Sequence, residues 1–243
     1  PESDLIAPER VQMQEMSPEA RRDNFDEIVA GYDPNQAIIE ASRCVQCGMC
    51  HEACPTHMDA PEYIRAIWQG DNEEAVRQIY RTNPFAHTCG RVCTHRCETA
   101  CSVAHRGEAI AIRWLKRYAM DAVGHDRVKQ IISEGKPDFI SGRRVAIVGA
   151  GPAGLTTAFD LAKQGHEVVV YEAMAEGGGM TRYGIPYYRL PAQSLEHDID
   201  VITSLGVTIE YNTRIGSDIT LEQLGQDFDA VALGHRLIDH HLV

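Results

Sequence analysis

Hydrophobic residues are spaced differently on the two sides of residue 140, and this change predicts two domains. Before it, apolar residues recur at the three- and four-residue intervals of amphipathic helices; after it, short apolar runs alternate with helical stretches. The first 32 residues are polar and show neither pattern. We therefore expect an extended arm over residues 1–32, an all-helical domain over residues 33–140 and an α/β domain over residues 141–243.

Helix boundaries in the all-helical domain follow from capping residues. Asp33, Pro34 and Gln36 have the order of a capping box with proline at the first helical position. Two amphipathic helices are expected next, at residues 59–70 and 71–80. Their apolar faces comprise Tyr63, Ile64, Ile67 and Trp68 in the first and Ala75, Val76, Ile79 and Tyr80 in the second.

A further helix is expected at residues 110–123, and its basic residues have two interpretations. Ile112, Leu115 and Ala119 form its apolar side. The charges of Arg113, Lys116 and Arg117 are most simply a solvated face, because polar stripes on helices usually are. Alternatively, some of them offset the negative charge of metal-bound thiolates nearby.

The second domain has the alternation of an α/β fold. Strands are expected at residues 144–148, 167–173, 207–211 and 230–233, with helices at 155–164, 195–205 and 219–225 between them. Such alternation predicts a parallel sheet with helices on both faces.

Charge and hydropathy exclude two classes of partner. The chain has 243 residues, with 35 acidic against 23 basic ones, and its formal charge of −12 disfavours nucleic acid and anionic membranes. No apolar run approaches the ~18 residues that span a bilayer, and the first residues lack a signal-peptide pattern. We expect a soluble, cytoplasmic protein without membrane insertion.

All eight cysteines lie in two short segments. Cys44, Cys47 and Cys50 are followed by Cys54 and then proline, which is the spacing of a bacterial ferredoxin-type segment. In two-cluster segments the cysteine before proline binds the other cluster. If the second segment mirrors the first, the predicted 4Fe-4S ligand sets are Cys44, Cys47, Cys50 and Cys101 for one cluster and Cys54, Cys89, Cys93 and Cys97 for the other.

Other uses of the cysteines are less consistent with the sequence. Disulfides are disfavoured because no secretory signal is present and reducing compartments keep thiols free. Two four-thiolate zinc sites are an alternative, but three closely spaced cysteines followed by Cys54 and proline favour iron. The intervening histidines are interpreted as loop residues rather than cluster ligands: His51, His57, His87, His95 and His105.

A glycine turn in the α/β domain predicts dinucleotide binding. The turn runs from Gly149 through Gly151 to Gly154 between a strand and a helix, where glycines permit a tight turn and close approach of a pyrophosphate. Glu172, at the end of the next strand, is placed to accept hydrogen bonds from a ribose. A glutamate there suits FAD or NAD rather than NADP.

A segment rich in glycine, proline and aromatic residues, 177–191, is expected to form a fixed loop rather than a helix or strand. Its position beyond the second strand predicts that it lies near the reactive ring of the cofactor.

Together these segments resemble one family of iron-sulfur flavoproteins. The motifs CxxCxxCxxxCP, CGRVC, AIRWLKRYAMD, VAIVGAGPAGL and GGGMTRYGIPYYRLP, within residues 35–234, resemble the family of the glutamate synthase small subunit. The N-terminal part of dihydropyrimidine dehydrogenase and the large subunit of bifurcating ferredoxin:NADP oxidoreductases also belong to it. The resemblance implies a helical domain with two 4Fe-4S clusters, followed by a Rossmann-like FAD-binding domain with its GIPxYRLP loop beside the isoalloxazine. The cofactor-binding residues expected on these grounds are Gly149, Gly151, Pro152, Ala153, Gly154, Glu172, Gly178, Gly179, Met180, Arg182, Gly184 and Ile185.

Two departures from the family pattern stand out. Several relatives use a Gln or Glu as the eighth cluster ligand where this chain has Lys116, which cannot serve; Cys89 is expected to replace it. In the family, a nicotinamide domain and a later Gly-Asp strand complete the flavin site, whereas this sequence stops just past Gly234 at GHRLIDHHLV. We expect an N-terminal portion of a longer protein or a chain completed by a partner.

The sequence therefore predicts an oxidoreductase in which FAD exchanges a hydride with NAD(P)H and two 4Fe-4S clusters pass electrons to a partner protein, within a hetero-oligomeric complex. No side chain is expected to act as a catalytic acid or base, because the cofactors carry the redox chemistry. The alternatives are an electron-relay subunit without its own nicotinamide site and a zinc-stabilised interaction domain.

Overall fold

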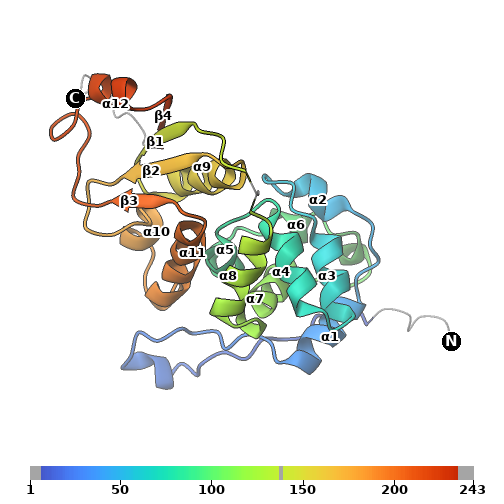
Figure 1. Ribbon diagram of the computed structural model, residues 1–243. Coiled ribbons are helices and arrows are strands. Elements are labelled where there is room, and N and C mark those ends of the chain that lie inside the picture. Colours follow the sequence, from blue (N-terminus) through green and yellow to red (C-terminus); the bar gives the residue numbers. More distant parts are fainter. Residues whose placement is uncertain (1–6, 137–138, 235–243) are drawn as a thin grey trace. The chain divides into compact units, whose positions relative to one another are not determined.

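The computed structural model describes residues 7–136 and 139–234 of the chain. These form two compact units (Figure 1). One comprises residues through Ile132 together with Pro186–Ser194; the other comprises Ser133–Ile185 and the residues from Leu195 onward. The predicted loop at 177–191 is thus divided between the units.

The first unit is helical. Its α-helices are α1 (Pro34–Ser42), α2 (Met49–Ala53), α3 (Ala60–Trp68), α4 (Asn72–Tyr80), α5 (Ala86–Val92), α6 (Arg96–Thr99) and α7 (Ile112–Ala122). Short 3-10 helices occur at Ala20–Arg22 and Ser102–His105, and α8 (His125–Glu134) runs from this unit into the second. Within the described ranges, no helix has the length and apolar character needed to cross a bilayer.

The predicted helix starts and apolar faces are largely confirmed. Asp33 and Gln36 form the reciprocal capping box at the start of α1. The predicted faces of α3 and α4 are buried, except for Trp68, which is 55% exposed. Helical residues follow one another about every 100°, so Trp68 falls at the edge of the face centred on Tyr63 and Ile67.

The solvated-face interpretation of α7 is wrong for two of its three cations. Lys116 and Arg117 are each only 5% exposed. The reason is that α7 is surrounded, with contacts to α1, α3, α4, α5 and α6. Arg117 satisfies its charge by ion pairs to Glu27 and Asp121.

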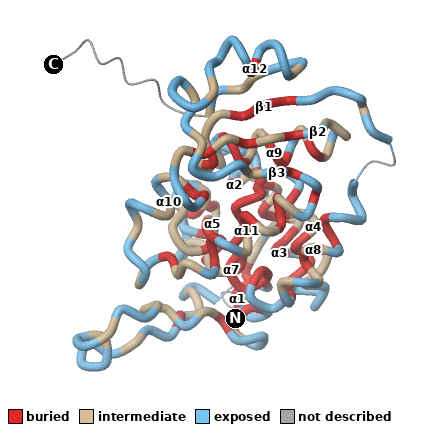
Figure 2. The backbone as a smooth tube through the Cα atoms, turned by 60° about the vertical axis from the view of Figure 1, so that its left-hand side comes forward, coloured by how far each residue is buried: buried red, intermediate tan, exposed pale blue. Residues whose placement is uncertain are grey.

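Residues 7–32, which precede α1, are mostly exposed (Figure 2). Glu15 and Val29 form an antiparallel bridge, and Met16 N donates to Ile28 O at 2.8 Å. Before this bridge, the chain lies against the helices: Arg43 Nε donates to Ala7 O at 3.0 Å. The segment is therefore held by hydrogen bonds and by ion pairs, such as that of Glu27 with Arg117, rather than by a large apolar face.

A buried ion pair joins three parts of the helical unit. Glu40 and Arg43 in and just after α1 are 2.7 Å apart and almost fully buried. Glu40 also accepts hydrogen bonds from Val11 N at 2.7 Å and Ala111 N at 2.8 Å. Arg43 donates to Glu108 O at 2.7 Å. These bonds satisfy both charges and fasten α1 to the segment that leads into α7.

The second unit contains a parallel sheet of β1 (Arg144–Val148), β2 (Glu167–Tyr171), β3 (Thr208–Glu210) and β4 (Ala230–Leu233), in the order β3-β2-β1-β4. Helix α9 (Pro152–Lys163) packs on β1 and β2, and α12 (Leu221–Asp227) contacts β4. Helix α11 (Ala192–Ser204) precedes β3. The predicted parallel α/β arrangement is confirmed. The residues after Gly234, with the sequence HRLIDHHLV, lie outside the described ranges.

The prediction that 177–191 contains no helix is wrong at one place. Met180–Tyr183 forms a single turn, α10, in which Gly184 N donates to Met180 O. Gly178 and Gly179 have positive φ angles of 114° and 51°, which reverse the chain and let this turn start.

We predict that Glu40→Gln lowers the free energy of unfolding by about 3–5 kcal/mol, because Arg43 would keep a buried charge without its anion. The measurement is urea unfolding followed by circular dichroism under anaerobic conditions. Glu62→Gln is the matched control, since Glu62 and Arg65 form an exposed pair whose loss costs no more than about 1 kcal/mol. Equal urea midpoints for the two variants would contradict the assigned role of Glu40.

Candidate functional site

Four of the cysteines line one apolar cavity in the helical unit. Cys44, Cys47, Cys50 and Cys101 surround it together with side chains such as Ile64 and Ile112. Cys44 directly follows α1 and its cap Arg43, Cys50 lies in α2, and Cys101 follows α6. The structure thus brings together the four thiols that the spacing assigned to one set.

The other four cysteines are carried by α2, α5 and α6. Cys54 caps the end of α2, and Cys97 lies in α6, which packs against α2. Cys89 lies in α5 four residues before its cap Cys93, so both thiols project from the same side of that helix. Cys93 and Cys54 lie close enough to Cys97 that repulsion between their thiolates helps to raise the pKa of Cys97. These three thiols are therefore neighbours.

The spacing of the thiols differs from that of a mononuclear zinc site. Thiolates bound tetrahedrally to zinc at about 2.3 Å lie roughly 3.8 Å apart. All eight cysteines are described, and no three of their sulfur atoms lie within 4.8 Å of one another. A larger inorganic group such as a 4Fe-4S cluster fits this wider spacing.

Two of the cysteine sulfur atoms accept hydrogen bonds from nearby polar groups. Ser102 Oγ donates to Cys47 Sγ at 3.0 Å, and His95 N donates to Cys93 Sγ at 3.3 Å. His95 and Gln46, each between two cysteines, have positive φ angles of 42° and 57°, which non-glycine residues rarely adopt. Such turns direct backbone N–H groups toward sulfur, and hydrogen bonds to sulfur tune cluster potentials.

The free thiols differ in acidity. Burial, with repulsion from neighbouring thiols, raises the pKa of Cys50 to about 12. Burial also raises the pKa of Cys97 to about 11, Glu98 adds to the rise, and Lys116 opposes it. At Cys47 burial is outweighed by the hydrogen bond from Ser102, so its pKa is lowered. Because metals bind thiolates, loading of such a site releases protons from the buried thiols.

Lys116 lies close to the second set of thiols. Its charge favours the thiolate forms of both Cys54 and Cys97. With its side chain almost fully buried, Lys116 fits the charge-compensating interpretation of the α7 cations.

The glycine turn of the second unit lines a cleft of about 600 Å³. Gly149 has a φ of 99°, which its lack of a side chain permits. A Cβ on Gly154 would overlap Gly149 O, so this glycine lets α9 start against β1. A cleft walled by backbone at a helix start suits a dinucleotide pyrophosphate.

Glu172 holds the turn as well as facing the cleft. Its carboxylate accepts hydrogen bonds from Ala150 N at 2.7 Å and Met174 N at 2.9 Å, one on each oxygen. Each carboxylate oxygen has a second acceptor position. Glu172 can therefore bind a ribose hydroxyl while it fixes the turn.

Only some of the predicted cofactor residues line the cleft. Those that do are Gly149, Gly151, Pro152, Ala153, Glu172, Gly179 and Met180. Those absent from its lining are Gly154, Gly178, Arg182, Gly184 and Ile185. Arg182 instead donates to Gly177 O at 2.6 Å and pairs with Glu196 at 3.3 Å, so its local contacts stabilise the loop.

The sequence motifs did not identify the rest of the cleft wall, which consists of Val148, Tyr171, Ala173, Met174, Tyr183, Thr213, Arg214, Ile215 and Gly234. Thr213, Arg214 and Ile215 follow β3. The rule that ligands bind beyond the carboxyl ends of parallel strands could have pointed to them.

Comparison with known proteins gives two family matches. Residues 21–128 match dihydropyrimidine dehydrogenase domain II, 4Fe-4S cluster, and residues 147–205 match an NAD(P)-binding Rossmann-like domain. The glutamate synthase [NADPH] small chain of Escherichia coli is 34% identical over 218 residues. This chain belongs to the iron-sulfur oxidoreductase family of the glutamate synthase small chain.

Two further relatives are similar to three quarters of this chain. NADPH-Fe(3+) oxidoreductase subunit beta of Geobacter sulfurreducens is 45% identical over 186 residues, 76% of this chain. NADP(+)-dependent formate dehydrogenase subunit beta of Moorella thermoacetica is 42% identical over 200 residues, 75% of this chain. The chain spans 27% and 28% of these two relatives and 46% of the glutamate synthase small chain. All three names denote parts of larger assemblies.

We predict that Gly154→Ala lowers stability by about 1–3 kcal/mol or more and lowers the content of bound dinucleotide, because the new methyl group overlaps backbone. Thermal unfolding and release of cofactor by acid measure the two effects. Gly225→Ala in α12 is the control: its Cβ meets open space, so stability should be unchanged or higher. Normal cofactor content in Gly154→Ala would contradict the assigned role of the turn.

Proposed function

We propose that the chain is the electron-transfer part of an NAD(P)H-linked iron-sulfur flavoprotein oxidoreductase. FAD would exchange a hydride with NAD(P)H, and two 4Fe-4S clusters would carry single electrons between FAD and a redox partner. The observation that carries the proposal is the convergence of Cys44, Cys47, Cys50 and Cys101 on one apolar cavity. Cys50 and Cys101 are buried, so the apolar wall would keep water away from their thiolates.

The proposed ligand sets follow the cysteine spacing. Cys44, Cys47, Cys50 and Cys101 would hold one cluster, and Cys54, Cys89, Cys93 and Cys97 the other. Ser102 and His95 would donate hydrogen bonds to bound sulfur, and Lys116 would offset negative charge at the second set. Each of these groups favours the more negative, reduced state of a cluster.

The proposed role of the second unit is to bind the adenosine end of FAD. Gly149, Gly151 and Gly154 would admit the pyrophosphate, and Glu172 would accept a ribose hydroxyl. Gly178, Gly179, Met180, Arg182, Gly184 and Ile185 are proposed to shape the loop beside the flavin. No proton-transfer role is assigned to a side chain.

We further propose that the chain acts within a hetero-oligomer, because two relatives are named as subunits. The cytoplasm is the proposed location, because its reducing conditions prevent disulfide formation by the cysteines. The partner would be a redox protein or catalytic subunit that exchanges electrons with the clusters.

Anaerobic reduction tests the proposed function. Adding NADPH or NADH to the purified whole protein should bleach the absorbance of flavin and clusters, because electrons pass from the nicotinamide to both. Dithionite serves as the control that reduces the clusters directly. Bleaching by dithionite alone would support an electron relay instead, and a colourless protein that contains zinc without iron would overturn the proposal.

The ligand sets make a separate prediction. Cys89→Ala should remove one cluster and roughly halve the iron content, because Lys116 cannot replace the lost thiolate. Iron analysis and electron paramagnetic resonance of the reduced protein provide the measurement. Cys101→Ala is the complementary variant and should remove the other cluster, leaving a different resonance signal. Two intact clusters in Cys89→Ala would overturn the pairing.

A further inference from the structure

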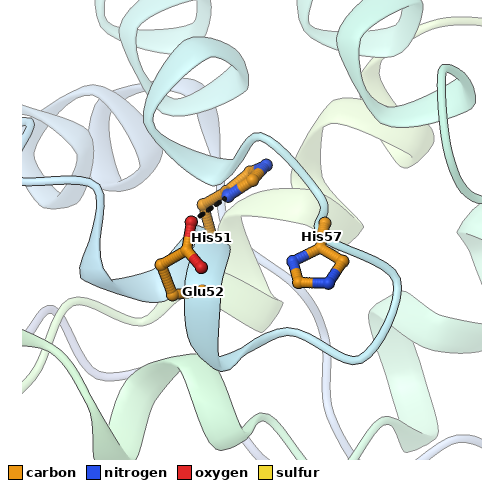
Figure 3. A group of neighbouring side chains, drawn as sticks. All are labelled: His51, Glu52 and His57. Atoms are coloured by element: carbon orange, nitrogen blue, oxygen red, sulfur yellow. Dashed lines mark hydrogen bonds and ion pairs between the residues drawn. The ribbon is translucent and has the colours of Figure 1, made fainter.

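A further potential metal site, beyond the two proposed clusters, lies close in sequence to Cys50 and Cys54. His51, Glu52 and His57 offer three ligand atoms that all lie within 4.8 Å of one another (Figure 3). Within the described part of the chain, no other three His, Cys, Asp or Glu residues meet this criterion. These three residues are referred to below as the surface triad.

The backbone holds the surface triad in place. His51 and Glu52 lie in α2. His57 N donates to Cys54 O at 2.9 Å, and His57 has a φ of 49°, so a tight turn after Cys54 brings its ring toward that helix. The two imidazole rings have centroids 5.4 Å apart. The end of α2 and the turn after it thus bring His57 close to His51 and Glu52.

The distances match those between ligands of one small cation. Nitrogen and oxygen ligands bound at about 2.1 Å, with angles between 90° and 110°, lie roughly 3.0–3.4 Å apart. His51 Nδ1 and Glu52 Oε1 are 3.1 Å apart. His57 is exposed and needs only a side-chain adjustment to close the remaining gap.

We propose that the surface triad binds one divalent first-row transition-metal ion, separate from the cysteine-bound clusters. First-row transition-metal ions bind two imidazoles and one carboxylate well, whereas Mg²⁺ and Ca²⁺ favour sites made of oxygen ligands alone. The site is exposed, so solvent completes the coordination and the ion exchanges. The formal charge of −12 on the chain adds a general attraction for cations.

Zinc is the appropriate probe because it has no redox chemistry of its own. The protein with its native cofactors is treated with EDTA, desalted anaerobically and titrated with Zn²⁺ by calorimetry, while visible absorbance reports that the clusters remain intact. We expect one Zn²⁺ per chain at the site. His51→Ala and His57→Asn should each weaken binding by roughly tenfold or more, equal to about 1.4 kcal/mol. Asn is chosen at position 57 because it tolerates a positive φ.

His105→Ala is the matched control. His105 is also exposed and lies near the cysteines in sequence, but it is outside the surface triad. This variant should keep the zinc affinity of the parent protein. The proposal is overturned if the parent protein binds no Zn²⁺, if His51→Ala and His57→Asn both bind it as tightly as the parent, or if His105→Ala weakens binding as much as they do. The cluster absorbance separates these outcomes from a failure of the proposed electron-transfer function.

Discussion

The buried pair of Glu40 and Arg43 is the interaction on which the arrangement of the helical unit depends most. α1 delivers Cys44, whereas Cys101 lies far along the chain. Glu40 binds Ala111 N and Arg43 binds Glu108 O, so the pair fastens α1 to the segment that follows Cys101. A four-thiolate cavity drawn from distant segments requires such a fixed junction, because an apolar contact alone would leave the register of the two segments free.

One of the two buried cations of α7, Lys116, lies close to thiols. α7 lies among five other helices, so its basic residues cannot all reach water. Arg117 forms ion pairs with Glu27 and Asp121. The positive charge of Lys116 favours the thiolate forms of Cys54 and Cys97. Desolvating a lysine is costly unless anions lie nearby. The position of Lys116 is therefore consistent with the metal-binding role that we propose for the thiols.

The cleft of the α/β unit depends on close backbone approach. Gly154 lies against Gly149 O, and Glu172 ties Ala150 and Met174 to the end of β2. These contacts give the turn one conformation before a ligand binds. The ligand then meets a preformed surface of backbone groups, while the side chains after β3 complete the wall.

The sequence by itself determined the capping box of α1, the succession of helices and strands, the parallel sheet and the intervals between cysteines. Each of these follows from local periodicity or from fixed intervals along the chain. Tertiary structure decided what local patterns cannot encode. The burial of Lys116 depends on the helices that pack around α7, and the exposure of Trp68 depends on which side of α3 is in contact with other helices. The convergence of His51 and His57 depends on a turn in which His57 has a positive φ angle, a conformation that non-glycine residues rarely adopt. The cleft wall at Thr213 and Arg214 likewise exists only because a parallel sheet brings the ends of separate strands to one edge.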